Sequence, residues 1–223
     1  MHGATSAAAE QAEAARYALL RRLAPAMRHH LVVNLQPIGM VYELMDHRLR
    51  GPQPDLAHVQ AGAHKIHGFA KAALHSCLDL VAWLAPDEPV STPCRTGVEE
   101  CMGLLASSLA FAGYAVRVDV QARSGEVSQS AVRHVLTAAL VHCTDAVAAP
   151  AELDLSAVAR PAGLEVTLAV RRVAGEGGNA LAATYRPLAW PDVDALAGAE
   201  GVAIARIGEG MVLNFPWVHP PMD

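Results

Sequence analysis

The chain is poor in aromatic residues, in charged residues and in cysteine. Aromatic side chains account for 4% of its 223 residues and charged side chains for 17%, whereas hydrophobic residues reach 52%. We expect a folded chain with an aliphatic core, because disordered chains are poor in apolar residues. The formal net charge of −5 disfavours nucleic acid as a partner, since proteins that bind it usually carry a basic surface.

Cysteine motifs and targeting signals are also missing. The chain has 4 cysteines, none of them in CxxC spacing, and we interpret them as small buried residues in a reducing compartment. No basic segment followed by an apolar run opens the chain, so no signal peptide is predicted. No apolar stretch of about 18 residues is free of charge and histidine, so no membrane span is expected. The expected location is the cytoplasm, with no membrane partner.

The first part of the chain is expected to form a helical hairpin. Apolar spacing predicts one helix over residues 10–48, bent at Pro25 and Pro37. Asp55 is a suitable N-cap for a second helix, whose apolar residues recur at spacings of three and four, as in a bundle seam. These residues are Leu56, Val59, Ala63, Ile66, Ala70, Ala73, Cys77, Leu80 and Leu84. Because a lone hairpin buries only one side of each helix, we expect a homodimer in which two hairpins form a four-helix bundle.

The second part is expected to be an α/β domain. Residues 85–93 contain three prolines and are interpreted as a linker, which gives domains at 10–85 and 93–217. The patterns predict helices near 95–112, 129–147 and 191–200, and strands near 114–120, 153–159, 164–170, 202–207 and 211–215. The expected fold class is therefore α+β: an antiparallel helical hairpin followed by a two-layer sandwich, with helices on one face of a mixed sheet.

One imidazole in the first helix is singled out by its position. At about 100° per residue, the apolar positions of residues 23–38 share one broad face; His29 points away from it and His30 lies at the border. A solvent-facing imidazole is neutral over much of the physiological pH range, so a ring nitrogen can attack phosphorus. The alternative is an ordinary exposed polar residue. The first fifty residues also carry six arginines, which form either a basic surface suited to a phosphoryl group or a solvated helix face: Arg16, Arg21, Arg22, Arg28, Arg48 and Arg50.

The order of elements and the segment around His29 resemble the transmitter core of two-component histidine kinases, over about residues 15–216. In that family the phosphoacceptor histidine is followed by an acidic or polar residue and, five positions on, by Asn or Pro. Here His30 and Asn34 stand at those positions, and His30, in the place of the acid, would accept a proton. The resemblance implies that His29 receives a phosphoryl group. The residues expected to lie beside it or to steer an acidic partner are Arg22, Arg28, His30, Val33 and Asn34.

The residues through which such kinases bind ATP are replaced. Ala138 and His142 stand where the family has asparagines that hold Mg²⁺ and phosphates, and residues 171–175 are Arg-Arg-Val-Ala-Gly in place of Asp-x-Gly-x-Gly. The combination resembles the ChpT-type histidine phosphotransferases, which are dimeric relays that bind no ATP. Their box, His-Asp-Leu-Val-Ser-Pro, is matched at His29, Leu31 and Val32. We therefore expect no cofactor on this chain, with Mg²⁺ only on a partner.

This resemblance implies a phosphotransferase that takes a phosphoryl group from one response-regulator receiver domain and passes it to another. Two alternatives stay open: a non-catalytic, kinase-like adaptor that binds or inhibits a receiver or a kinase, and a kinase with an unusual ATP site. His64 and His67 could share a metal ion, but no Cys or carboxylate completes a ligand set, so no metal is expected. His134 and His142 are interpreted as structural or surface residues. The glycine-rich segment 175–178 lacks the Lys-Ser/Thr of a phosphate loop and is interpreted as a turn.

Overall fold

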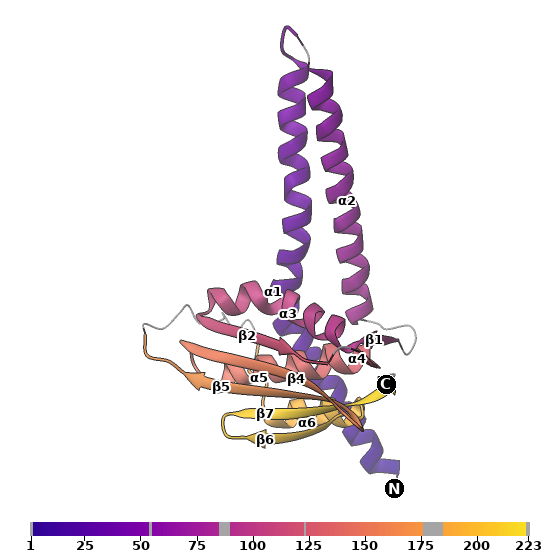
Figure 1. Ribbon diagram of the computed structural model, residues 1–223, viewed down its shortest axis with the longest axis vertical. Helices are drawn as coiled ribbons and strands as arrows, with labels where there is room; N and C mark the ends of the chain where they lie inside the picture. The colour runs from indigo at the N-terminus through magenta and orange to yellow at the C-terminus, as the bar shows by residue number, and fades with distance from the viewer. Residues whose placement is uncertain (1, 54, 85–89, 123, 176–184, 222–223) are drawn as a thin grey trace. The chain divides into compact units, whose positions relative to one another are not determined.

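The computed structural model describes residues 2–53, 55–84, 90–122, 124–175 and 185–221. It divides into two compact units, one of residues 25–87 and one that combines residues 1–24 with residues 88–223. Helix α1 (His2–Leu49) passes through both units (Figure 1). The boundary therefore differs from the expected domains, in which the whole first helix belonged with the hairpin.

The unit of residues 25–87 is an antiparallel hairpin of α1 and α2 (Leu56–Leu84). Helix α1 begins at His2 rather than near residue 10, and it continues through both of its prolines. Asp55 caps α2 as predicted, because its carboxylate accepts a hydrogen bond from the backbone N–H of His58 at 3.1 Å. The helices approach closely at Gly62, where an added Cβ would lie 2.5 Å from Cγ and Sδ of Met45.

The other unit is built on a seven-stranded mixed sheet. Its strands are β1 (Ser91–Pro93), β2 (Tyr114–Val120), β3 (Glu126–Ser128), β4 (Ala151–Arg160), β5 (Gly163–Arg172), β6 (Ala203–Ile207) and β7 (Gly210–His219). Its helices are α3 (Cys94–Phe111), α4 (Gln129–Ala131), the π-helix η1 (Val132–Leu136), α5 (Thr137–Ala146) and α6 (Trp190–Ala199). The strand order is β1-β3-β7-β5-β4-β2, with β6 paired to β7. Strands β2 and β4 are parallel, and the other pairs are antiparallel.

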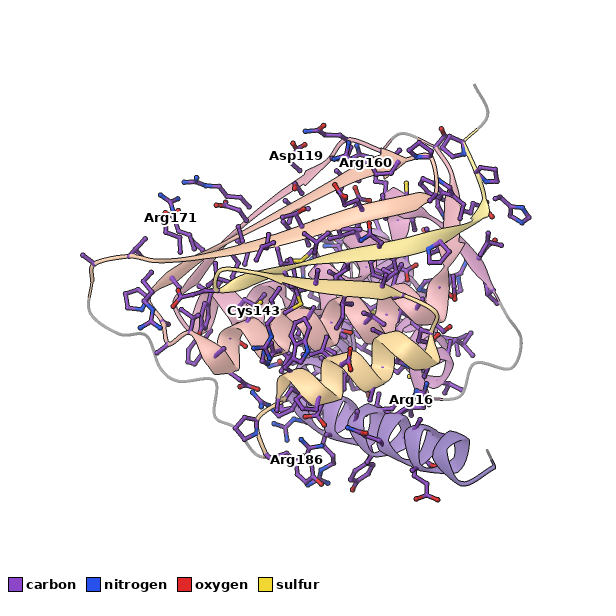
Figure 2. All side chains as sticks on the ribbon, turned by 90° about the horizontal axis from the view of Figure 1, so that it is seen from below. Arg16, Asp119, Cys143, Arg160, Arg171 and Arg186 are labelled. Carbon is purple, nitrogen blue, oxygen red and sulfur yellow. The ribbon has the colours of Figure 1, made fainter. Side chains whose placement is uncertain are left out.

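The core of this unit lies between the sheet and a layer of helices on one of its faces (Figure 2). In β4, Leu153, Leu155 and Ala157 are buried and alternate with half-buried residues, so one face of the strand is turned to the core. From the helices, Leu136 and Leu140 are also fully buried. The predicted fold class is confirmed: a helical hairpin followed by a two-layer α/β sandwich.

The first turns of α1 belong to the α/β unit. Ala12, Ala15, Leu19 and Leu23 recur at spacings of three and four and are all buried, and Figure 2 shows this segment beside α6. Of the apolar face expected over residues 23–38, Leu23 and Met27 are buried, whereas Leu35 is 51% exposed. The sequence could not show that the sandwich covers the first turns, because apolar spacing indicates which side of a helix is buried but not which element packs against it.

The structure refines the prediction at several further places. Strand β1 falls within the expected linker 85–93 and pairs with β3, and strands of three residues are too short for alternation to reveal them. The helix expected over 129–147 contains a π-helical turn. Residues 176–178 of the glycine-rich segment lie outside the described residues. Within the part of the chain that the structure describes, no helix combines the length and apolar character needed to cross a membrane.

Candidate functional site

His29 lies on the exposed side of α1 in the hairpin unit. Five residues further on, Asn34 is half-buried; its side-chain amide donates to the Ser76 hydroxyl of α2 at 3.0 Å and to the His30 carbonyl at 3.2 Å. Asn34 therefore fixes which side of α1 faces α2. At about 100° per residue, five positions place His29 about 140° away from Asn34 around the helix, so its imidazole is directed to solvent as the sequence predicted.

Exposed apolar residues continue along the side of α1 that carries His29. Val33 follows it by four residues and is 51% exposed, and Met40 and Leu44 are exposed further along, at 64% and 52%. We name these three residues the His29 strip. Arg28, next to the histidine, is also exposed. An exposed row of large apolar side chains is typical of a protein interface.

A second set of exposed apolar residues lies on other sides of the hairpin. On α1 these are Val32, Leu35, Tyr42 and Leu49, and on α2 they are Leu74, Leu78 and Val81. Of the predicted seam of α2, Ala73 is buried and Ile66 and Leu80 are half-buried, whereas Ala63, Ala70 and Cys77 are exposed. We name the exposed residues of this paragraph the open seam. One partner helix covers only part of the predicted stripe, which is wider than α1 can bury.

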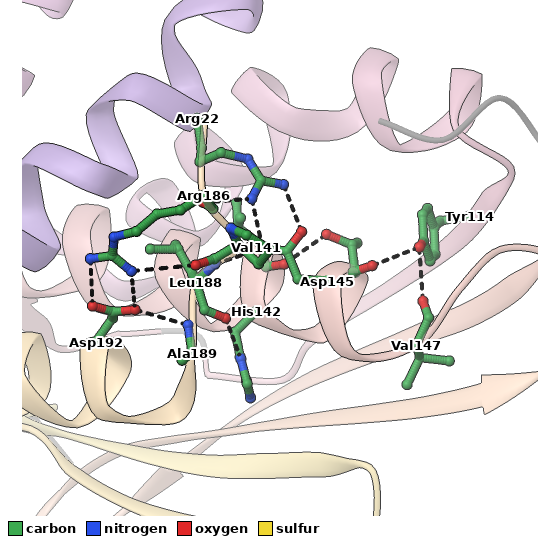
Figure 3. Close-up of polar contacts among 12 residues, drawn as sticks. Arg22, Tyr114, Val141, His142, Asp145, Val147, Arg186, Leu188, Ala189 and Asp192 are labelled. Atoms are coloured by element: carbon green, nitrogen blue, oxygen red, sulfur yellow. Dashed lines mark hydrogen bonds and ion pairs between the residues drawn. The ribbon is translucent and has the colours of Figure 1, made fainter. Parts of the chain in front are cut away.

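Arg22 does not lie on the exposed surface where the sequence placed it. Its guanidinium binds both carboxylate oxygens of Asp145 at 2.7 Å, and the two side chains are 6% and 12% exposed. Asp145 also accepts a hydrogen bond from Leu188 N–H at 2.8 Å, and Arg22 donates to the Arg186 carbonyl at 3.3 Å (Figure 3). The Arg22 side chain is thus held within the α/β unit by Asp145, which also neutralises its charge. Of the two arginines expected to steer a partner, Arg28 alone is available.

The helical segment that the resemblance assigns to ATP binding contains a buried histidine. His134 is buried, and its Nδ1 lies 2.9 Å from Glu200, which also accepts hydrogen bonds from Ser130 at 2.7 Å and from Arg16 at 3.3 Å. Burial alone would raise the pKa of Glu200, but the hydrogen bonds from His134 and Ser130 and the charge of Arg16 outweigh it, so the pKa is lowered. Glu200 therefore joins α1, α4, η1 and the end of α6 as a carboxylate.

The other two positions that the resemblance assigns to nucleotide binding, Ala138 and His142, also lie in this helical segment. Ala138 is fully buried, and His142 is half-buried with its Nδ1 2.8 Å from the Leu188 carbonyl. For a metal ion, the described residues contain no group of three or more His, Cys, Asp and Glu side chains in suitable positions. His64 and His67 are both exposed on α2.

Comparisons with known proteins give structural neighbours only. No protein-family model matches the chain, and no curated protein matches it. Among solved structures, a histidine kinase from Burkholderia phymatum is 17% identical, with 90% of this chain and 98% of that chain covered and a TM-score of 0.46. The Acinetobacter baumannii histidine kinase AdeS is 12% identical, with 79% and 94% covered and a TM-score of 0.41. A bacterial phosphotransferase is 14% identical, with 88% and 95% covered and a TM-score of 0.39.

These neighbours are two histidine kinases and a phosphotransferase, each matched over most of both chains. With every one of these TM-scores below 0.5 and every identity below 20%, they assign neither an activity nor a partner to this chain.

Proposed function

We propose that this chain is a dimeric histidine phosphotransferase of a two-component phosphorelay, which passes a phosphoryl group between receiver domains through His29. One observation carries the proposal. The imidazole of His29 is exposed on a helix whose rotation is fixed by the bond from Asn34 to Ser76. A nucleophile that a fixed helix face presents to a second protein is what group transfer between proteins requires.

The transfer would proceed by attack of a neutral imidazole nitrogen on the phosphorus of a phospho-aspartate. The bond from phosphorus to nitrogen forms while the bond from phosphorus to the aspartate oxygen breaks, and the aspartate leaves as a carboxylate. The proton on the other ring nitrogen is then lost, and the adjacent His30 is the group we propose to accept it. The receiver supplies Mg²⁺ and its own acidic pocket, so this chain contributes mainly alignment. The return step to a second receiver is the reverse.

The surface around His29 suits a receiver domain. The His29 strip offers an apolar row beside the imidazole, and such a row gains free energy when a partner removes it from water. Arg28 adds a positive charge next to the nucleophile, which attracts the acidic site of a receiver and speeds the encounter. Arg22 has no part in this contact, because its side chain is held by Asp145.

Dimerisation would cover the open seam. Its residues recur along both helices and are exposed in the single chain, and a second hairpin laid against them completes a four-helix bundle. We also propose that the phosphoryl group comes from a partner and not from ATP. The substitutions at Ala138, at His142 and over 171–175 remove the side chains with which a kinase holds Mg²⁺ and adenine.

The experiment is phosphoryl transfer from a purified receiver domain charged with labelled acetyl phosphate. We expect label on the wild-type chain, stable to base and labile to acid as phosphohistidine is, and none on His29→Ala. His47→Ala is the matched control, because His47 is exposed on the same helix and 18 residues, or about five full turns, place it on the same side. Transfer that survives His29→Ala would refute the assignment.

The same samples test the remaining alternatives. A receiver that binds wild type and His29→Ala equally, with no phosphohistidine formed on either, would make the chain an adaptor. A rise in melting temperature with ATP and Mg²⁺ would make it a kinase, since a ligand that binds the folded state stabilises it. We expect neither result.

A further inference from the structure

A pocket in the α/β unit has no part in the proposed transfer. It has a volume of about 510 Å³ and lies where the end of α5, the start of α6 and the turn between β6 and β7 meet. Its lining includes His142, Val147, Trp190, Arg206, Glu209 and Met211. Pockets that bind small molecules span about 300–1,000 Å³ and combine apolar walls with a few polar groups. The dimensions and lining of this pocket fall within that description.

The pocket presents a flat cationic surface. The guanidinium carbon of Arg206 lies 4.3 Å from the ring centroid of Trp190, in a cation–π contact. A guanidinium stacked on a ring keeps its N–H edges free, and these edges match the two oxygens of a carboxylate. Among the carboxylates that the structure describes, none lies within ion-pair distance of Arg206. The arginine is therefore oriented by stacking and not by an acidic partner.

The remaining polar groups of the pocket leave it positive. Glu209, the one acidic lining residue, binds Arg172 at 3.1 Å, so its charge is offset. His142 Nδ1 lies 2.8 Å from the Leu188 carbonyl, and a carbonyl accepts, so this nitrogen carries the hydrogen. Arg206 is the one charge in the lining without an offsetting partner among the described residues.

We propose that this pocket binds a small planar anion, an aromatic carboxylate, with the carboxylate on the free edge of Arg206 and the ring against the apolar wall at Trp190 and Met211. An aromatic carboxylate matches this lining, because its negative charge pairs with the guanidinium of Arg206 and its flat ring packs against the apolar walls. A neutral aromatic compound would meet the walls but leave the guanidinium without its anion. The pocket residues belong to the α/β unit and His29 to the hairpin unit, and this proposal does not rest on the proposed function.

The test is isothermal titration of the full chain with 2-naphthoate, and with 2-naphthalenemethanol as a neutral probe of the same shape. We expect one saturable naphthoate site per chain. Loss of a bidentate, charge-assisted contact should weaken binding by about tenfold or more, both in Arg206→Gln and for the neutral alcohol. Arg206 is exposed, so this variant is expected to fold.

Arg171→Gln serves as the matched control. Arg171 is an exposed arginine of the same unit that pairs with Glu152, and it is not among the pocket residues. We expect this variant to bind naphthoate like wild type. The proposal is overturned if no saturable site is found, if Arg206→Gln binds as tightly as Arg171→Gln, or if the alcohol binds as tightly as the carboxylate.

Discussion

Replacing Asp145 with Asn should destabilise the α/β unit far more than the loss of an ordinary surface charge. The Asp145 carboxylate is the sole acidic partner of Arg22 among the described ion pairs, and both side chains are largely buried, at 12% and 6% exposed. Asn keeps the size of the side chain and an oxygen that can accept from Leu188 N–H. The substitution therefore isolates the consequence of leaving a buried guanidinium without a counter-charge.

The expected magnitude follows from burial. Removing one member of a fully buried ion pair costs about 3–5 kcal/mol, because the remaining charge has lost both water and partner. The small exposure of both side chains lowers this to about 2–3 kcal/mol for Asp145→Asn. Asp145→Ala should cost about 1 kcal/mol more, since Leu188 N–H then loses its acceptor. The double variant Arg22→Met, Asp145→Leu should recover much of the loss, because no unpaired charge remains.

The measurement is urea unfolding followed by circular dichroism, with Arg160→Gln as the control. Arg160 pairs with Glu165 at 2.7 Å, but these side chains are 55% and 29% exposed, so its loss should cost less than about 1 kcal/mol. For a unit of this size, the Asp145→Asn effect corresponds to a fall in melting temperature of roughly 2–4 °C per kcal/mol. If Asp145→Asn and Arg160→Gln change the free energy of unfolding equally, the reasoning about the Arg22 pair is wrong.

Two further predictions concern a close helix approach and an acid-sensitive carboxylate. Gly68→Ala should stabilise the hairpin by about 0.5–1 kcal/mol in urea unfolding, because nothing lies within 4 Å of the new Cβ. Gly62→Ala should raise the free energy of unfolding by less, because its Cβ would lie 2.5 Å from the Met45 side chain. Equal increases in the two variants would contradict the close approach of the helices. The hydrogen bond from Arg186 lowers the pKa of Asp192 below its ordinary 3.8, so this carboxylate stabilises the fold above that pH and the benefit is lost as pH falls through the lower folded pKa. Unfolding curves from about pH 5 to pH 2 should show wild type losing its advantage over Asp192→Asn, and a constant difference would refute this.

The sequence predicted the elements whose signal is local. The strand predicted from alternation over 114–120 has the same bounds as β2. The N-cap at Asp55 is also confirmed. Each of these signals depends only on neighbours a few residues away. Exposure of His29 followed in the same way, since a helical wheel needs only the sequence of one helix. Its role as phosphoacceptor stays a proposal.

The sequence could not predict contacts that join distant segments. Arg22 was expected on an open surface, yet it binds Asp145, which lies 123 positions away. Nothing in the sequence distinguished Ser76 from other polar residues, although its hydroxyl accepts the hydrogen bond that fixes the rotation of α1. Asp145 offered a weak signal, as the one acidic residue of α5.

Composition and periodicity by themselves determined that this chain folds into a helical hairpin and a mixed sandwich, and that His29 faces away from the packed side of its helix. The tertiary structure alone decided that the first turns of α1 belong to the sandwich, that Arg22 is buried in an ion pair, and that Trp190 and Arg206 meet in one pocket. The physical reason is the distance along the sequence over which each effect acts. Backbone propensity and amphipathic spacing act over one or two turns, whereas burial and charge pairing depend on which distant surfaces are brought together when the chain closes on its core.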